Sequence, residues 1–130
     1  MRKNQFSGYQ DLKREGKQLE RRYAEWKRFL ACTREQSPEI QKRFRILCEC
    51  IEKQRIRVLD EQIRIETRIS QIPDSLLRQI FTLRYLEGLS WQFIAQRIGG
   101  GNEDSIRMMH QRYLRRLEQE KTEEANRAAG

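Results

Sequence analysis

The sequence predicts an all-α protein, with a long N-terminal antiparallel helical hairpin followed by a compact C-terminal helix-turn-helix module. Three observations predict this. Apolar residues recur at alternating spacings of three and four along the first half of the chain. Charged residues make up 35% of the 130 residues, which favours long, solvated helices over a thick core. The two prolines fall where helices are expected to begin or end.

The first predicted helix has a heptad-like apolar seam that contains one small residue. The seam consists of Tyr9, Leu12, Gly16, Leu19, Tyr23, Trp26 and Leu30. A short connector follows, and Ser37-Pro38-Glu39 is typical of a helix start. Ser37 would be the N-cap and Pro38 would occupy the first helical position.

The second predicted helix runs from Pro38 to about Gln71, roughly 50 Å at 1.5 Å per residue. Its apolar stripe is Ile40, Phe44, Leu47, Ile51, Val58, Ile65, Ile69 and Ile72. A shorter second stripe indicates that the helix is covered on more than one side. It consists of Ile56, Leu59 and Ile63. A bare helix of this length cannot bury its own stripe, so we expect a coiled-coil-like hairpin over residues 1–72, which could also form a homodimer.

Three short helices are predicted after Pro73, which ends the long helix because proline disfavours helical geometry at the residue before it. The first spans residues 75–87, and Gly88 stops it. The second begins at its N-cap, Ser90, and ends in the glycine turn of residues 99–101.

The third short helix begins near Asn102 and completes a module that spans residues 73–117. One of its faces is apolar and consists of Ile106, Met109, Tyr113, Leu114 and Leu117. The opposite face carries Arg107, Met108, Gln111, Arg112 and Arg115. A short helix, a glycine turn and a helix with basic residues outside describe a helix-turn-helix, whose Arg and Gln could reach bases or phosphates in a major groove. Residues 118–130 lose apolar side chains and are expected to fray.

The stretches on either side of the glycine turn have a familiar pattern. Residues 83–95 read LRYLEGLSWQFIA, and residues 106–117 read IRMMHQRYLRRL. The first resembles the LRY-x-EG-x-S-x-x-x-IA stretch of sigma-70-like region four, and the second resembles the recognition helix of that family. With its charged hairpin, the chain looks like small phage-encoded transcriptional regulators of the ArpU type. The resemblance covers residues 75–117 and implies a protein that binds double-stranded DNA sequence-specifically and regulates transcription; the three cysteines, read as reduced thiols, indicate a cytoplasmic location.

The resemblance implies roles for individual positions. Ser90 and Trp91 match positions that touch the DNA backbone, and Arg112 matches a phosphate-contacting position. The segment that matches the reader of the minus-35 promoter element contains Asn102, Glu103, Asp104, Ser105, Arg107 and Met108. Glu103 stands where the family usually has a basic residue and Met108 where it has a polar one. The glycine turn is one residue longer than in the family, which leaves the register of residues 102–105 open by one.

Taken from the residues themselves, the acidic turn has two interpretations. Glu103 and Asp104 lie at a helix N-terminus, where carboxylates stabilise the helix dipole. They could instead accept a hydrogen bond from a cytosine amino group. Gln111 would join the base readers, and Arg115 would hold a phosphate.

Other chemistry is not expected. The cysteines Cys32, Cys48 and Cys50 have no paired metal-ligand spacing, so reduced thiols are favoured over a Cys32–Cys48 disulfide. The single histidine, His110, has no ligand partner on its face and is expected to pack or to form a surface hydrogen bond. No nucleophile–base pair, cofactor motif or membrane-length apolar run is present, so we expect neither an enzyme nor a membrane protein.

The positive charge is concentrated in the predicted hairpin. Residues 1–71 hold 18 Lys and Arg against 11 Asp and Glu, whereas residues 72–117 hold seven against four, within a net charge of +8. The hairpin could contact flanking DNA phosphates or only be solvated. Two other functions stay open: a protein that docks on RNA polymerase without reading DNA, favoured by the acidic turn, and a small DNA-packaging, terminase-like subunit.

Overall fold

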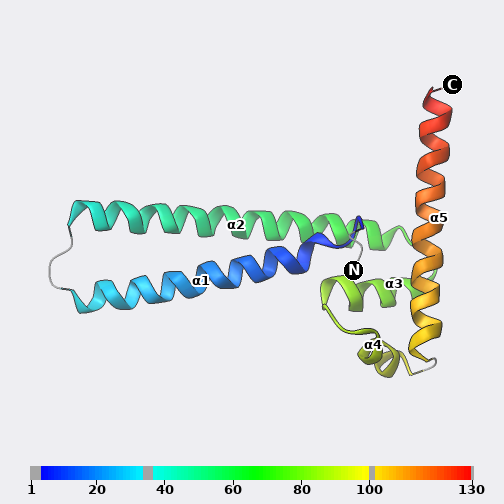
Figure 1. The fold of residues 1–130 in the computed structure, drawn as a ribbon, viewed down its shortest axis with the longest axis horizontal. Coiled ribbons are helices and arrows are strands. Elements are labelled where there is room, and N and C mark those ends of the chain that lie inside the picture. Colours follow the sequence, from blue (N-terminus) through cyan, green and yellow to red (C-terminus); the bar gives the residue numbers. More distant parts are fainter. Residues whose placement is uncertain (1–3, 34–36, 100–101, 130) are drawn as a thin grey trace. The chain divides into compact units, whose positions relative to one another are not determined.

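The computed structural model describes residues 4–33, 37–99 and 102–129. The prediction of an all-α fold is confirmed, because every regular element in these ranges is a helix (Figure 1). The chain divides into two compact units, Met1–Thr67 and Arg68–Gly130, which we call the hairpin and the head. None of the helices in the described ranges has an apolar stretch long enough to cross a membrane.

The hairpin contains α1 (Gly8–Cys32) and most of α2 (Pro38–Ser70), which run antiparallel and side by side (Figure 1). The predicted start of α2 is confirmed. The backbone N–H of Ile40 donates to Ser37 Oγ at 3.2 Å, and Pro38 is the first helical residue. The long second helix is continuous over 33 residues, as its uninterrupted apolar stripe predicts.

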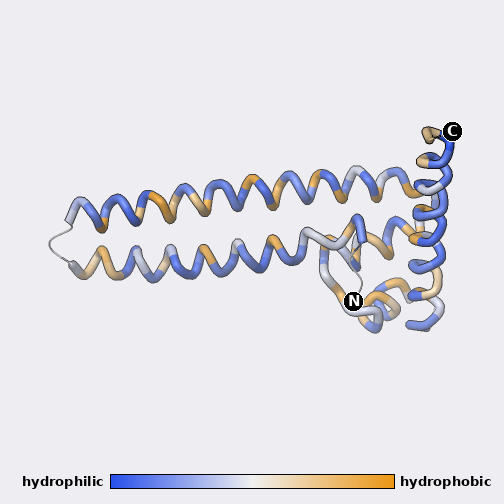
Figure 2. Tube along the Cα trace, turned by 45° about the horizontal axis from the view of Figure 1, so that its top comes forward, coloured by the Kyte–Doolittle hydropathy of each residue, from blue (hydrophilic) through white to orange (hydrophobic). Residues whose placement is uncertain are grey.

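The apolar seam predicted for α1 is also confirmed. All seven of its residues are buried or half-buried, and most positions between them are exposed. The same holds for the eight residues of the stripe predicted for the second helix, of which Ile51, Ile65, Ile69 and Ile72 are buried; Ile72 lies just beyond the end of α2. Figure 2 shows hydrophobic positions in orange that recur along both helices between longer hydrophilic stretches. Tyr23 of α1 stacks on Phe44 of α2 with ring centroids 5.5 Å apart, which joins the helices near the connector.

One polar side chain interrupts the apolar contact between the two helices. Gln54 is only 4% exposed, and its Nε2 donates to the backbone oxygen of Leu12 at 2.9 Å and to Glu15 Oε2 at 3.2 Å. Gly16 lies next to it, and a Cβ there would be in ordinary contact with Gln54 Cγ at 3.8 Å. A buried amide costs free energy unless it is hydrogen-bonded, so these two bonds favour one register of the hairpin.

The shorter stripe of α2 is not covered by the described part of the chain. Ile56, Leu59 and Ile63 are 52%, 56% and 61% exposed. The expectation that α2 is covered on more than one side therefore does not hold for this chain alone. The three side chains face away from the seam that packs on α1, because they lie about half a helical turn from it.

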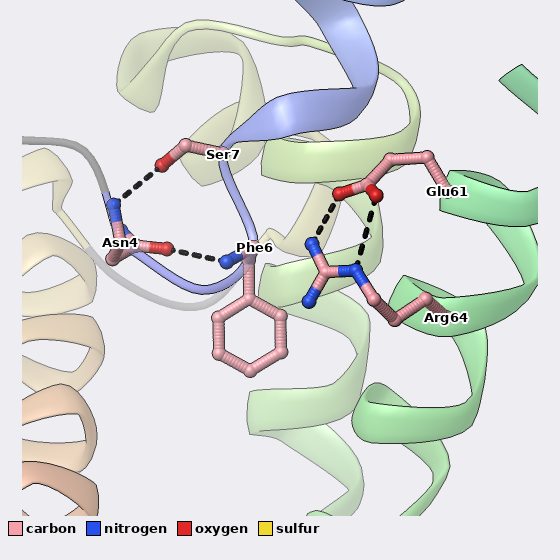
Figure 3. A network of polar contacts seen from close by, with 5 residues as sticks. All are labelled: Asn4, Phe6, Ser7, Glu61 and Arg64. Carbon is pink, nitrogen blue, oxygen red and sulfur yellow. Dashed lines mark hydrogen bonds and ion pairs between the residues drawn. The ribbon is translucent and has the colours of Figure 1, made fainter. Parts of the chain in front are cut away.

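A tight turn precedes α1 and is tied by hydrogen bonds from its own side chains (Figure 3). Asn4 Oδ1 accepts from the N–H of Phe6 at 2.8 Å, and Ser7 Oγ accepts from the N–H of Asn4 at 2.9 Å. In α2, Glu61 and Arg64 form a two-bond ion pair, and this hydrogen bonding raises the pKa of Arg64. Each of these polar contacts is local to its own segment, and Phe6 in the turn is 2% exposed.

The head continues with four helical segments. They are α3 (Ser75–Phe81), the π-helix η1 (Thr82–Leu86), α4 (Trp91–Ile98) and α5 (Glu103–Ala129). One helix was expected over residues 75–87, but its last turn widens into η1. The N–H of Glu87 bonds to the oxygen of Thr82, five residues earlier. Gly88, at φ 72°, then ends it as predicted.

The predicted caps of α4 and α5 are confirmed. Ser90 Oγ accepts from the N–H of Phe93 at 3.4 Å, and Asn102 Oδ1 accepts from the N–H of Ser105 at 2.7 Å. Gly99 ends α4 in the left-handed conformation at φ 77°. The other two glycines of the predicted turn lie outside the described residues.

The far end of α5 differs from the expectation. Residues 118–130 were expected to fray, but α5 continues to Ala129 with exposed side chains. The segment is rich in Glu, Ala, Lys and Arg, which are strong helix formers. Arg127 lies 3.9 Å from Glu123, one helical turn away, which adds a small local stabilisation.

Candidate nucleic-acid interface

Helices α4 and α5, which correspond to the predicted helix-turn-helix, pack against each other in the head together with α3. Both α3 and α4 pack against α5. The contact is apolar: Ile80 and Phe81 of α3, Ile94 of α4 and Ile106 of α5 are all buried. Burying these side chains fixes which face of α5 turns inward and which turns outward.

The outward face of α5 carries most of the predicted DNA-binding residues. The exposed members are Asp104, Ser105, Met108, Gln111, Arg112 and Arg115. They recur at helical spacing over three turns from the capped N-terminus. Asn102, the capping residue, is also exposed. Met108 is 52% exposed, so an apolar side chain lies in the middle of this polar and basic face. We call the six residues Asp104, Ser105, Met108, Gln111, Arg112 and Arg115 the α5 outer row.

Two predicted base readers lie apart from the α5 outer row. Arg107 and Glu103 are half-buried, and Arg107 Nη2 donates to Glu103 Oε1 at 2.6 Å. The pair spans one helical turn and is exposed by more than 40% on each side chain, so it contributes little to stability. Its consequence is local: the Arg107 charge is compensated, and the Glu103 carboxylate already has a partner.

The predicted backbone-contacting pair lies at the start of α4. Ser90 is exposed, although its hydroxyl is used in capping. Trp91 is half-buried and lies between two other side chains: the guanidinium of Arg84 is 4.5 Å from the indole centroid, and the His110 ring is 4.6 Å away, edge to face. Arg84 also donates to the oxygen of Leu89 at 3.0 Å. Trp91 therefore has a packing role here.

Arg84 of η1 contacts α4 by stacking on Trp91. Its stacking on Trp91 partly removes it from water, and this desolvation lowers its pKa, while the nearby charge of Arg107 lowers it further. Arg84 belongs to the LRY motif but was not among the residues predicted to contact DNA.

Helix α4 also carries an exposed aromatic side chain whose exposure was not predicted from the sequence. Phe93 is 61% exposed on the scaffold helix, and its neighbours Gln92, Gln96 and Arg97 are exposed as well. A phenylalanine in a short amphipathic helix is usually counted with the core. The exposure of Phe93 could have been predicted from its position, because it directly precedes the fully buried Ile94 and consecutive residues of a helix point to different sides.

His110 lies in the aromatic core of the head. It is 7% exposed, and its Nε2 is hydrogen-bonded to the hydroxyl of Tyr85. Its ring centroid lies 5.1 Å from that of Phe81. Within the described residues, its Nδ1 is buried without a hydrogen-bond partner. Burial lowers the pKa of His110 to about 4, and the charge of Arg84 adds to this, so the ring is neutral near pH 7.

The packing role predicted for His110 is confirmed, and its hydrogen bond to Tyr85 is buried and not at the surface. The described residues contain no group of three or more His, Cys, Asp or Glu side chains that could hold a metal ion. All three cysteines are free thiols; Cys32 and Cys50 are exposed, and Cys48 is half-buried. The alternative of a Cys32–Cys48 disulfide is therefore absent.

No protein-family profile, no curated protein and no solved structure matches this chain. The functional interpretation therefore depends on the geometry of the head, on the charge of its surfaces and on the motif in residues 83–95.

Proposed function

We propose that this protein is a cytoplasmic, sequence-specific DNA-binding regulator of transcription, encoded by a phage or another mobile element, and that α5 enters the major groove. The observation that carries the proposal is the α5 outer row. It presents hydrogen-bonding and basic side chains from a capped helix N-terminus, on a helix that α3 and α4 hold by apolar packing. A protruding helix of this kind matches the width of a major groove.

The residues of the row divide by their chemistry. Ser105 and Gln111 can donate to and accept from base edges, and Met108 offers an apolar contact to a thymine methyl group. Arg112 and Arg115 carry no ion pair within the described residues and can hold phosphates on either side of the groove. Exposed Ser90, at the α4 N-terminus, can add a backbone contact through its hydroxyl.

The Glu103–Arg107 pair sets a condition on base reading. Arg107 can reach a guanine only when it leaves Glu103, whose carboxylate it contacts at 2.6 Å. Asp104 is exposed beside it and can accept from a cytosine amino group. Both acids repel phosphates, so we expect weak binding to random sequences through this face and a larger share of the affinity from base contacts.

The test is to select bound sequences from random duplex DNA and then titrate variants against the selected site. Arg112→Ala should weaken all sequences alike and reduce the salt dependence, whereas Arg107→Ala should relax selectivity at one position. Arg127→Ala, on the exposed far end of the same helix, is the matched control. If all three variants bind every duplex as the wild type does, α5 does not read DNA.

A second candidate function is docking on RNA polymerase without DNA reading. The observation that favours it is Met108, half-exposed next to an acidic first turn, since an apolar side chain with acidic neighbours suits a protein surface. A pull-down with polymerase, run beside a DNA shift assay, separates the two. Met108→Lys should abolish docking if this candidate is right, and it should leave or strengthen DNA binding if it is wrong.

A further inference from the structure

The face of α1 that is turned away from α2 carries a row of basic side chains. Arg14, Lys17, Arg21 and Arg28 follow one another at spacings of three, four and seven residues, and all are exposed. These spacings put them on one side of a helix. Opposite them lies the apolar seam that packs on α2. We call Lys17, Arg21 and Arg28 the α1 basic row.

Two acidic residues of α1 are directed toward α2. Glu15 accepts a hydrogen bond from Gln54 of α2, and Glu20 lies 3.8 Å from Arg55 of α2. Glu25 is exposed four residues after Arg21 and three before Arg28, so it borders the basic face. The outward face therefore carries more basic than acidic side chains.

The α1 basic row is not compensated within the chain. Arg14 is paired with Asp11 one turn earlier, but Lys17, Arg21 and Arg28 form no ion pair with any described residue. Such a concentration of like charge is costly unless an anion neutralises it. The excess of +7 over residues 1–71 is thus directed outward in part along α1.

We infer that the α1 basic row binds the phosphate backbone of duplex nucleic acid without reading its sequence. From Lys17 to Arg28 the helix rises by roughly 16 Å, about the length of five base-pair steps at 3.4 Å each. A straight row of cations of this length can follow one strand. Its side chains are lysine and arginine only, which position a protein on phosphates and carry no base specificity.

A lipid surface is the weaker alternative. A helix that lies on an anionic membrane inserts an apolar face beside its basic residues. Here the apolar face of α1 is the seam packed on α2, and the exposed apolar side chains of α1 are Ala24, Phe29, Ala31 and Cys32. These four lie at the end of the helix near Arg28 and form no continuous apolar face along the basic row, so a linear array of phosphates is the better match for it.

The inference goes beyond the proposed function and does not rest on it, because α1 belongs to the hairpin and α5 to the head. It is tested with the full chain and a duplex of random sequence, by anisotropy over a salt series. The test variant carries Lys17→Gln, Arg21→Gln and Arg28→Gln. The matched control carries Lys42→Gln, Lys53→Gln and Arg57→Gln, which remove the same charge from exposed positions of α2.

We expect the test variant to lose about 2.7 from the slope of log affinity against log salt, about 0.9 per phosphate contact. The control should lose less than a third of that, and circular dichroism should show unchanged helix content in both. Equal losses in the two triple variants would overturn the inference, because net charge and not the row would then matter. Binding of the wild type to anionic vesicles but not to duplex, lost in the test variant, would also overturn it.

The two proposals fail in different ways. If Arg112→Ala and Arg107→Ala bind as the wild type does while the α1 triple variant loses random-sequence affinity, the α5 proposal is wrong and the α1 row stands. If the triple variant keeps its affinity for random duplex while the α5 variants lose selectivity, the α1 row is wrong and α5 reading stands.

Discussion

Tyr85 of η1 and His110 of α5, 25 residues apart in sequence, share a buried hydrogen bond between the tyrosine hydroxyl and the imidazole Nε2. Their rings lie 5.6 Å apart, and Phe81 packs on both. The π-helical turn changes the direction in which Tyr85 points, because the extra residue per turn rotates its side chain relative to an α-helical register. The pair therefore links the LRY motif to the helix that we propose as the DNA reader.

The protonation of His110 should control the stability of the head. The pKa of His110 is about 4 in the folded chain, against 6.5 as its ordinary value. The unfolded chain therefore binds a proton between these values and the folded chain does not. Stability from this residue is complete above pH 6.5 and is lost as the pH falls toward 4. The difference corresponds to about 3 kcal/mol.

Two measurements check this. His110 is the single histidine of the chain, so its imidazole signal in an NMR titration reports this pKa directly. Unfolding of the wild type should be compared with Tyr85→Phe/His110→Phe, which removes both partners, at pH 7 and pH 4.5. Carboxylates contribute equally to both proteins, so the pH dependence should be smaller in the double variant. Parallel pH curves for the two proteins would contradict the prediction.

Two isoleucines of α2, two residues apart, should differ sharply in their contribution to stability. Ile65 is fully buried and Ile63 is 61% exposed. Ile65→Ala should lower the free energy of unfolding by about 2–5 kcal/mol, because it removes buried methyl groups and leaves a cavity. Ile63→Ala should change it by less than about 0.5 kcal/mol. Chemical denaturation of both variants measures the difference.

The outcome for Ile63 also bears on the uncovered stripe of α2. A large loss for Ile63→Ala that grows with protein concentration would show that the stripe of Ile56, Leu59 and Ile63 is covered by a second copy. A small, concentration-independent change is what the single chain predicts, because these side chains are already more than half exposed.

The helical hairpin could be predicted from sequence because its contact is periodic. The seven seam residues of α1 and the eight residues of the main apolar stripe of α2 were assigned correctly from spacings of three, four and seven. Gln54 could not be assigned in this way, since glutamine is mostly exposed in proteins. A positional signal existed: Gln54 lies three residues after Ile51 and four before Val58, in the middle of the stripe. Its burial depends on Leu12 and Gly16, which only the folded hairpin brings close.

The glycines of the chain give a matched test of backbone strain. Gly16 is inside α1, and an added Cβ would meet only Gln54 Cγ at an ordinary 3.8 Å. Gly16→Ala should therefore raise stability by about 0.5–1 kcal/mol, the helix preference of alanine over glycine. Gly99 has open space around it but a φ of 77°, so Gly99→Ala should lower stability by about 1 kcal/mol or more. Thermal unfolding of the pair measures both signs, and equal signs would contradict the assignment.

The candidate site was harder to predict than the fold. The exposed residues of α5 followed from periodicity, because Ile106 and its apolar neighbours define the buried face. The ion pair that compensates the charge of Arg107 was not predicted, although Glu103 lies four residues earlier, which is a typical spacing for an ion pair on a helix. The stacking of Arg84 on Trp91 could not be derived, because it depends on the path of the chain through Gly88.

The Glu103–Arg107 pair leads to the prediction that removing a charged side chain from the proposed interface raises the affinity for DNA. Replacing Glu103 with glutamine removes a carboxylate that repels phosphates and releases Arg107 from its 2.6 Å contact. If α5 enters a major groove, Glu103→Gln should bind duplex DNA several-fold more tightly, since ion pairs of this exposure contribute only about 0.2–1 kcal/mol and are readily exchanged for a phosphate or a guanine.

Glu123→Gln, which lies beside Arg127 at the exposed far end of α5, is the control and should leave the affinity unchanged. Anisotropy titrations at one salt concentration suffice. Weaker binding by Glu103→Gln at every sequence would mean that Glu103 itself accepts a hydrogen bond from the DNA, and selection with the variant would then show at which base.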